Sequence, residues 1–116
     1  MKVFAQFIDI DSFISIRKNT ILQFGDSWKT IGTVWLINPG SSAPCNVSIS
    51  DNELTMLNSI DNKDHWQVAS IDPTMRFLKK ILNGSYIGEN RELNGVIRLL
   101  PSQTLIMCIW VGERME

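Results

Sequence analysis

An asparagine followed by a loop of small residues is the first feature of the chain that could do chemistry. Asn38 ends an apolar run and is followed by Pro39, Gly40, Ser41 and Ser42. An amide side chain both donates and accepts hydrogen bonds, so it can orient a water molecule or read the edge of a nucleobase. Gly40 lets backbone approach a ligand closely, and the serine hydroxyls with nearby N–H groups can hold a phosphate. The loop predicts a ligand site with Asn38 as its catalytic residue; the alternative is an Asn-Pro-Gly-Ser turn without a ligand.

A second candidate stands at the start of a predicted helix. Asp72 and Pro73 are the residue types expected at an N-cap and at the first helical position. The free N–H groups and the dipole of a helix N-terminus attract anions. Thr74 and Arg76 add a hydroxyl and a positive charge to the first turn. We expect Asp72, Thr74 and Arg76 to bind a ligand; the alternative is a well-capped helix whose Arg76 points to solvent.

Charge changes sign at this second motif. Residues 50–74 carry five acids and one base, a net charge of −4, whereas residues 75–100 carry five bases and two acids, a net charge of +3. The basic block suits an anionic partner, and a solvated helix face is the alternative. Its candidates for holding a nucleic-acid backbone, beside Arg76, are Lys79, Lys80 and Arg98.

The elements that must position these residues follow from hydropathy patterning. Apolar or alternating segments predict strands at residues 2–8, 20–24, 32–37, 95–100 and 104–111. The run 32–37 is nearly all apolar, which is typical of a central strand covered on both faces. A short helix is predicted at residues 51–57. The clearest helix begins at Asp72 and ends at Asn83 and Gly84.

The order of these elements indicates the fold class. Strands, loop, helix and strand in that order are typical of an α/β or α+β domain. The 116 residues leave no room for a second core, so we expect a single domain over residues 1–116. Our expectation is a small three-layer α/β or α+β domain with a central, mostly parallel sheet. Ligands bind outside the carboxyl ends of strands in such sheets, which is where Asn38 stands.

Composition excludes several classes of protein. Hydrophobic residues make up 44% of the chain and charged residues 20%, which excludes wholesale disorder. A net charge of −1 excludes a strongly basic nucleic-acid coat. Asp9 and Asp11 interrupt the first apolar run before a signal-peptide core forms, and later runs fall short of the ~20 residues of a membrane span. We expect a cytoplasmic protein without a membrane partner.

Recognised cofactor and metal motifs are missing from the sequence. It contains no P-loop, dinucleotide fingerprint, nucleophile elbow or zinc spacing, so we expect no cofactor and no metal. The single histidine, His65, stands beside Trp66 in a stretch that includes Asp61 and Asp64. It is a candidate general base or stacking residue, and an incidental loop residue is the alternative.

The two motifs together resemble a known family. Residues 38–43 read Asn-Pro-Gly-Ser-Ser-Ala, and residues 72–76 read Asp-Pro-Thr-Met-Arg. This pair looks like the bacterial and phage family called domain of unknown function 1643, whose members show Leu-Asn-Pro-Ser-Thr-Ala-Asp and then Asp-Pro-Thr-x-Arg. The lead-in at residues 17–28 is similar as well. That family carries no established activity.

The first motif is also similar to the Ile-Asn-Pro-Gly-x-Ser-Ser-Ala signature of mismatch-specific uracil-DNA glycosylases. A helix with an Arg-Phe-aromatic-Lys run follows in those enzymes, similar to residues 76–79 here. They are three-layer domains that flip a base into a pocket, and their motif asparagine acts on the water or base near the glycosidic carbon. The resemblance therefore implies binding of a nucleotide or nucleic-acid base, and hydrolysis of a glycosidic bond in which Asn38 takes that role.

A non-enzymatic protein-interaction module is the alternative function. The glycosylases carry a histidine loop late in the chain, whereas this chain has only His65, ahead of its helix. Both families run longer, so we expect the segment after Leu100 to be divergent or shortened. The alternative is a shortened or inactive relative, associated with phage or with host defence. Whether the protein is an enzyme, its ligand and its oligomeric state stay open at this point.

Overall fold

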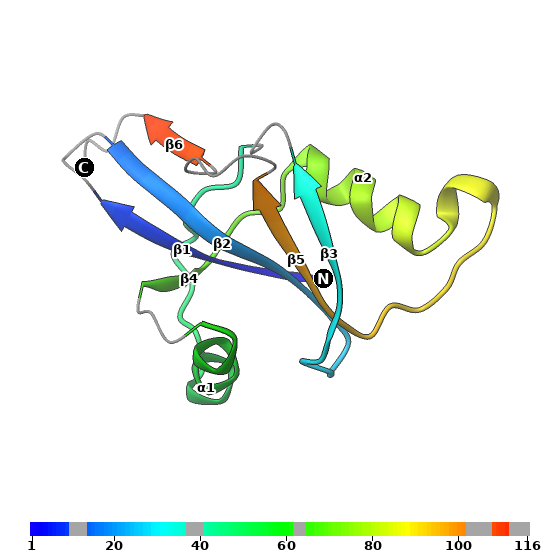
Figure 1. Cartoon of the computed structure of the whole chain (residues 1–116), viewed down its shortest axis with the longest axis horizontal. Coiled ribbons are helices and arrows are strands. Elements are labelled where there is room, and N and C mark those ends of the chain that lie inside the picture. Colours follow the sequence, from blue (N-terminus) through cyan, green and yellow to red (C-terminus); the bar gives the residue numbers. More distant parts are fainter. Residues whose placement is uncertain (10–13, 37–40, 62–64, 102–107, 112–116) are drawn as a thin grey trace.

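The computed structural model describes residues 1–9, 14–36, 41–61, 65–101 and 108–111 (Figure 1). Its elements, in chain order, are β1 (Lys2–Asp9), β2 (Ile14–Phe24), β3 (Thr30–Leu36), α1 (Asp51–Ile60), β4 (Trp66–Val68), α2 (Pro73–Leu82), the 3-10 turn η1 (Ser85–Ile87), β5 (Gly95–Pro101) and β6 (Cys108–Val111). The five predicted strands are confirmed over their described residues, although β2 begins six residues before its predicted start and β4 was not predicted. The predicted helix at Asp72 is confirmed with Asn83 as its C-cap, and α1 runs three residues beyond its predicted end.

The strands form one mixed sheet. Their order is β3-β5-β2-β1-β4, and β6 pairs with β2 as well. Only β3 and β5 run parallel; the other described pairs are antiparallel. The prediction of a mostly parallel sheet is therefore wrong. Four residues (10–13) separate β1 from β2, too few for the crossover that a parallel pair needs.

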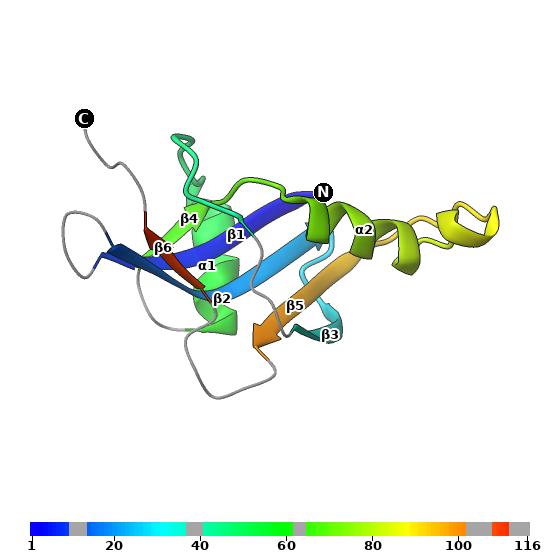
Figure 2. The same cartoon turned by 90° about the horizontal axis from the view of Figure 1, so that it is seen from above.

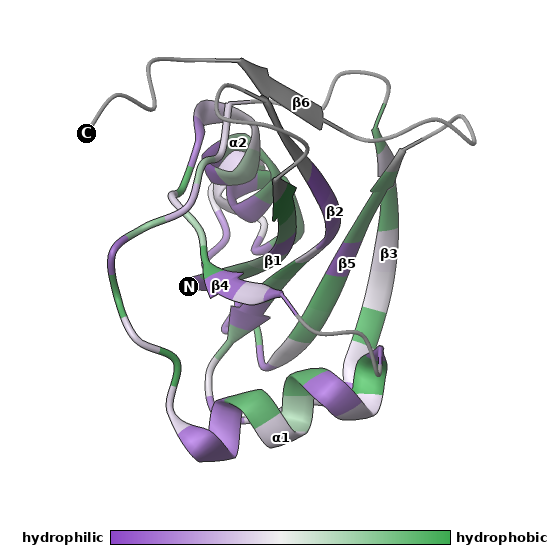
Figure 3. Ribbon diagram, turned by 90° about the vertical axis from the view of Figure 1, so that its left-hand side faces the viewer, coloured by the Kyte–Doolittle hydropathy of each residue, from purple (hydrophilic) through white to green (hydrophobic). Residues whose placement is uncertain are grey.

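The sheet is covered by one helix on each face (Figure 3). Successive side chains of a strand point to opposite faces. Val3, Ala5 and other alternate residues of the sheet pack in one cluster with Met75 of α2. Phe4, between them, packs in a second cluster with Leu57 of α1. The domain is thus a small α+β fold in which the sheet lies between α1 and α2.

The strand that leads into the first motif lies at the edge of the sheet. β3 pairs with β5 and is the last strand in the order, as Figure 2 shows. On the side of α2 its Val34 and Leu36 pack against the core. On the other face Trp35 is 64% exposed, and Ile31, at the register shift between Thr30 and Gly32, is 46% exposed. The predicted central strand is therefore wrong, because α1 packs over residues of the other strands and leaves this face of β3 open.

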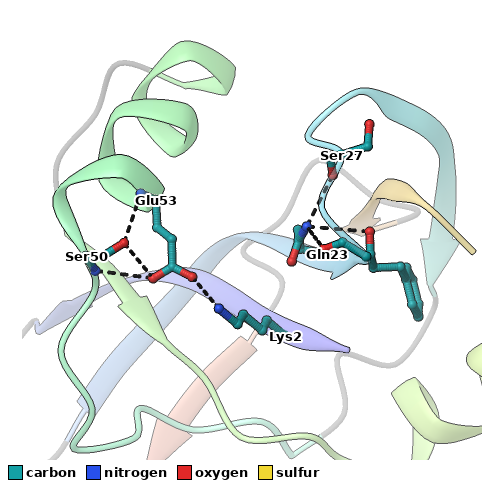
Figure 4. Close-up of polar contacts among 7 residues, drawn as sticks. Lys2, Gln23, Ser27, Ser50 and Glu53 are labelled. Atoms are coloured by element: carbon teal, nitrogen blue, oxygen red, sulfur yellow. Dashed lines mark hydrogen bonds and ion pairs between the residues drawn. The ribbon is translucent and has the colours of Figure 1, made fainter.

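Two groups of hydrogen bonds fix the ends of elements (Figure 4). At α1, the Ser50 hydroxyl accepts a hydrogen bond from the Glu53 backbone N–H, and the Glu53 carboxylate accepts from the Ser50 backbone N–H. This reciprocal capping box satisfies two free donors of the helix start. After β2, the Gln23 amide donates to the carbonyls of Gly25 and Ser27 at 2.7 and 3.2 Å, which fixes the turn toward β3.

The capping box gives a pH-dependent prediction. Lys2 donates to the Glu53 carboxylate at 2.8 Å, and this hydrogen bond lowers the Glu53 pKa below its ordinary value. A lowered pKa stabilises the fold above the unfolded-state pKa, and that contribution is lost as the pH falls through the folded-state pKa. We expect Glu53→Gln, which keeps the capping geometry, to cost about 0.5 kcal/mol at pH 7, since the Lys2 side chain is largely exposed.

Urea denaturation of wild type and Glu53→Gln from neutral pH to about pH 3 checks this expectation. The difference in the free energy of unfolding should shrink as the pH falls. A difference that stays constant over that range would show that the ionised carboxylate contributes nothing beyond the cap.

Candidate functional site

The two sequence motifs meet at the carboxylate of Asp72. The backbone N–H groups of Ser41 and Ser42 donate to Asp72 Oδ2 at 3.1 and 3.2 Å. The other oxygen, Oδ1, accepts from the Met75 backbone N–H at 2.9 Å and caps α2. One carboxylate, 3% exposed, therefore joins the segment after the Asn38 loop to the start of the helix. The structure therefore brings the two motifs together through these residues.

Further hydrogen bonds join the segment of Ser41 and Ser42 to the residues that precede Asp72. The Ser42 hydroxyl donates to the Ser70 carbonyl at 2.6 Å, and the Ala43 N–H donates to the Ser70 hydroxyl at 2.9 Å. The Ser70 N–H in turn donates to the Ala43 carbonyl at 2.9 Å. Residues 41–43 and 70–72 thus form a closely bonded pair of segments, which we call the Asp72 junction.

A buried arginine faces the Asp72 junction from β2. Arg17 is 1% exposed, and its Nη1 lies 4.0 Å from Asp72 Oδ2. The same nitrogen donates to the Ser42 carbonyl at 3.3 Å. Sequence patterning missed this residue as part of the site, because which face of β2 it occupies depends on pairing with β1. The only signal was its place in the lead-in that resembles the uncharacterised family.

The hydrogen bonds divide the predicted ligand residues into two groups. The N–H groups of Ser41 and Ser42, predicted to face a phosphate, donate to Asp72 instead. Ser42 and Asp72 are buried, so their side chains serve to hold the junction. Ser41 and Arg76 are exposed and Thr74 is half-buried, so these three residues stay at the solvent side of the junction.

Asn38 and Gly40 lie outside the described residues, which stop at Leu36 and resume at Ser41. Both of those boundary positions are fixed. Leu36 pairs with Pro101 at the end of β3, and Ser41 is bonded to Asp72. The four residues 37–40 therefore start at the carboxyl end of β3 and end at the Asp72 junction.

The predicted basic residues do not share one surface. Arg76, Lys79 and Lys80 are exposed on α2. On β5, Ile97 and Leu99 pack in the cluster of α2, so Arg98 between them points to the face of α1. A nucleic-acid backbone that runs along α2 meets the first three residues and leaves Arg98 on the opposite side of the sheet.

Lys79 also lines a cavity at the far end of α2. The cavity has a volume of about 550 Å³, and its polar walls include Asn83, Arg91 and Asn94. Arg91 forms a surface ion pair with Glu89, with Nη2 and Oε2 2.5 Å apart. The charged side chains that line the cavity are two acids and two bases, Asp26, Glu92, Lys79 and Arg91, so their charges offset each other.

The stretch around His65 contributes little to a site. His65 is exposed and has a positive φ of 77°. Asp61 accepts a hydrogen bond from the Asn19 side chain at 2.8 Å, and Asp64 lies outside the described residues. Within the described part of the chain, no three His, Cys, Asp or Glu side chains are grouped so as to hold a metal ion. Nor is any described helix long and apolar enough to span a bilayer.

Neither protein-family models, nor curated proteins, nor solved structures give a match to the chain.

Proposed function

We propose that the chain binds a nucleotide or a nucleic-acid base at the loop of residues 37–40. The proposal rests on the resemblance of the two motifs to the uncharacterised family and to the mismatch-specific uracil-DNA glycosylases. The observation that supports it is the Asp72 junction. Its carboxylate holds the backbone of Ser41 and Ser42, which follow the loop, and the pairing of β3 with β5 holds Leu36, which precedes it. A binding loop held on rigid elements needs little ordering when it takes a ligand.

Each residue has a distinct role in this proposal. The Asn38 amide reads the edge of the base, and Gly40 gives the backbone room to approach it. The Ser41 hydroxyl, Thr74 and Arg76 contact the ligand from the solvent side of the junction. Asp72 and Ser42 act as positioning residues, because their polar atoms are engaged inside the protein. Exposed Lys79 and Lys80 supply contacts to a phosphate backbone along α2.

Hydrolysis of a glycosidic bond is the finer form of the proposal. In it the Asn38 side chain orients a water molecule toward the sugar carbon that carries the base. The carbon–oxygen bond forms, the bond to the base breaks, and the base leaves with its bonding electrons. The proton of the water passes to the departing base or to solvent.

A binding assay with matched asparagine variants tests the proposal. Fluorescently labelled oligonucleotides that contain uracil, single-stranded and as a mismatched duplex, serve as probes. We expect Asn38→Ala to weaken binding at least about tenfold, since it removes a bidentate contact to the base. Asn52→Ala, at an exposed position of α1, should bind as wild type does. Equal affinity of wild type and Asn38→Ala, or no binding by wild type, would reject the proposed site.

Release of free uracil in the same samples separates an enzyme from a non-enzymatic relative. Release by wild type that is lost in Asn38→Ala supports the hydrolytic proposal. Binding without release supports the alternative of a shortened, inactive relative that acts through its partners. That alternative is favoured by one observation, the exposed apolar side chains of Ile31 and Trp35 on β3.

A further inference from the structure

The two edges of the described sheet are protected differently. β4 is three residues long, and Pro44 and Cys45 are bonded along its outer side. Pro44 forms a bridge to Ala69, and the Cys45 N–H donates to the Val68 carbonyl at 2.8 Å. β3 is seven residues long, and β5 is the one described strand with which it pairs. Its outer N–H and C=O groups therefore face away from the described sheet (Figure 2).

β3 carries only one of the features that normally protect an open edge, a register shift against β5 between Thr30 and Gly32. Edge strands usually carry charged side chains or proline, which discourage pairing with another chain. The sequence of β3 is Thr-Ile-Gly-Thr-Val-Trp-Leu, without either. Since Val34 and Leu36 pack toward α2, alternation places Thr33 and Trp35 together on the opposite face, and both are exposed. Ile31 is exposed as well and lies at the register shift.

We propose that β3 pairs with β3 of a second copy of this chain, antiparallel, about a two-fold axis at Thr33. Thr33 is the central residue of β3, so this register aligns the full strand with its copy. It sets Ile31 opposite the partner's Trp35 and Thr33 opposite the partner's Thr33. Aromatic with β-branched residues and threonine with threonine are favourable cross-strand pairs.

The same register suits the face that points to α2. It sets Val34 opposite the partner's Gly32, so a branched side chain lies beside the one residue of β3 without a side chain. No charged residue of β3 meets a like charge, since the strand has none. Because the strands are antiparallel, the carboxyl ends of the two β3 strands lie at opposite ends of the new pair.

The size of this interface sets the expected affinity. Trp35, at 64% exposed, and Ile31, at 46% exposed, are the large side chains that it removes from water. Pairing of two seven-residue strands with these side chains buries on the order of 1,000 Å² in total, below the size of most permanent dimers. We therefore expect a reversible dimer with a dissociation constant in the micromolar range, roughly 10 µM.

Sedimentation equilibrium of the ligand-free chain tests this proposal independently of base binding. From about 1 µM to about 1 mM, the mass should rise from the monomer value of 13.2 kDa toward twice that value. Thr33→Lys sets two positive charges opposite each other on the axis and should weaken the dimer at least about tenfold. Gln67→Lys adds the same charge at an exposed position of β4 and should dimerise as wild type does.

If Thr33→Lys does not fold, a disulfide cross-linking experiment tests the same proposal. Thr33→Cys should form a covalent dimer under mild oxidation, because directly opposed residues of an antiparallel pair lie within disulfide reach. Gln67→Cys is the control, and wild type gives the background from its own Cys45 and Cys108. A chain that is monomeric at all concentrations, a dimer that survives Thr33→Lys, a dimer that Gln67→Lys equally disrupts, or equal cross-linking of both cysteine variants would overturn the proposal.

Discussion

Replacing Asp72 with alanine is expected to lower the free energy of unfolding by about 4 kcal/mol. Loss of an N-cap side chain costs about 1 kcal/mol, and removal of one member of a buried ion pair costs about 3–5 kcal/mol. Asp72 has both roles, since it caps α2 and faces the buried guanidinium of Arg17. The substitution also removes the acceptor for the backbone N–H groups of Ser41 and Ser42. A loss of this size is a large share of the 5–15 kcal/mol by which small domains are stable.

Chemical denaturation of three variants measures this effect. Asp72→Asn keeps an acceptor that caps well but removes the charge, so we expect a smaller loss, about 2 kcal/mol. Asp51→Ala, an exposed acid in the first turn of α1, is the matched control and should cost about 0.5 kcal/mol. If Asp72→Ala cost no more than Asp51→Ala, the carboxylate would not hold the junction. If Asp72→Ala does not fold, Asp72→Asn takes its place in the comparison. A loss of free energy of unfolding no larger for Asp72→Asn than for Asp51→Ala would then contradict the expectation.

Replacing Gly95 with alanine is expected to cost about 3 kcal/mol. Gly95 has a φ of 142°, which a residue with a side chain rarely adopts, at a cost of about 1–3 kcal/mol. An added Cβ would lie 2.7 Å from the Lys29 carbonyl oxygen and 2.7 Å from Ile31 Cγ2. These atoms stand at the start of β3, where the Val96 N–H donates to the same carbonyl at 2.8 Å. The substitution should therefore loosen the pairing of β3 with β5.

Gly88→Ala is the matched control for this substitution. Gly88 also has a positive φ, 81°, but an added Cβ meets nothing within 4 Å. Its expected cost is the backbone term alone, about 1 kcal/mol. Thermal unfolding should show a much larger fall of the midpoint for Gly95→Ala, since 1 kcal/mol moves the midpoint of a domain of this size by about 4 °C. Equal midpoints for Gly95→Ala and Gly88→Ala would mean that residues 29–31 shift to make room for the added Cβ without a loss of stability.

Local signals in the sequence predicted part of this fold well. The start of α2 was predictable because Asp72 and Pro73 act on the backbone beside them, and its end because Asn83 and Gly84 do the same. Strand pairing was not predictable in this way. The apolar pattern of β3 matches a buried strand, yet the face with Trp35 is open, because what covers a face depends on where α1 packs.

The candidate site was predictable to a similar extent. The sequence indicates that Asp72 caps a helix and that the serine loop offers N–H groups, and each feature by itself favours a ligand site. The structure joins them to each other, because the second carboxylate oxygen of Asp72 reaches Ser41 and Ser42. Arg17 was not predictable as their neighbour, since only the register of β1 and β2 brings it to that face. A contact between residues so far apart in the chain leaves no local pattern.

The most direct test of the account locates the bound base by nuclear magnetic resonance. A short oligonucleotide that contains deoxyuridine is titrated into the ¹⁵N-labelled chain, and changes in the amide shifts are mapped on the sequence. If the Asp72 junction holds a base-binding loop, the largest changes fall on residues 37–41 and on the first turn of α2 near Thr74 and Arg76. Changes that spare these residues, whether absent or confined to other parts of the chain, would contradict the account.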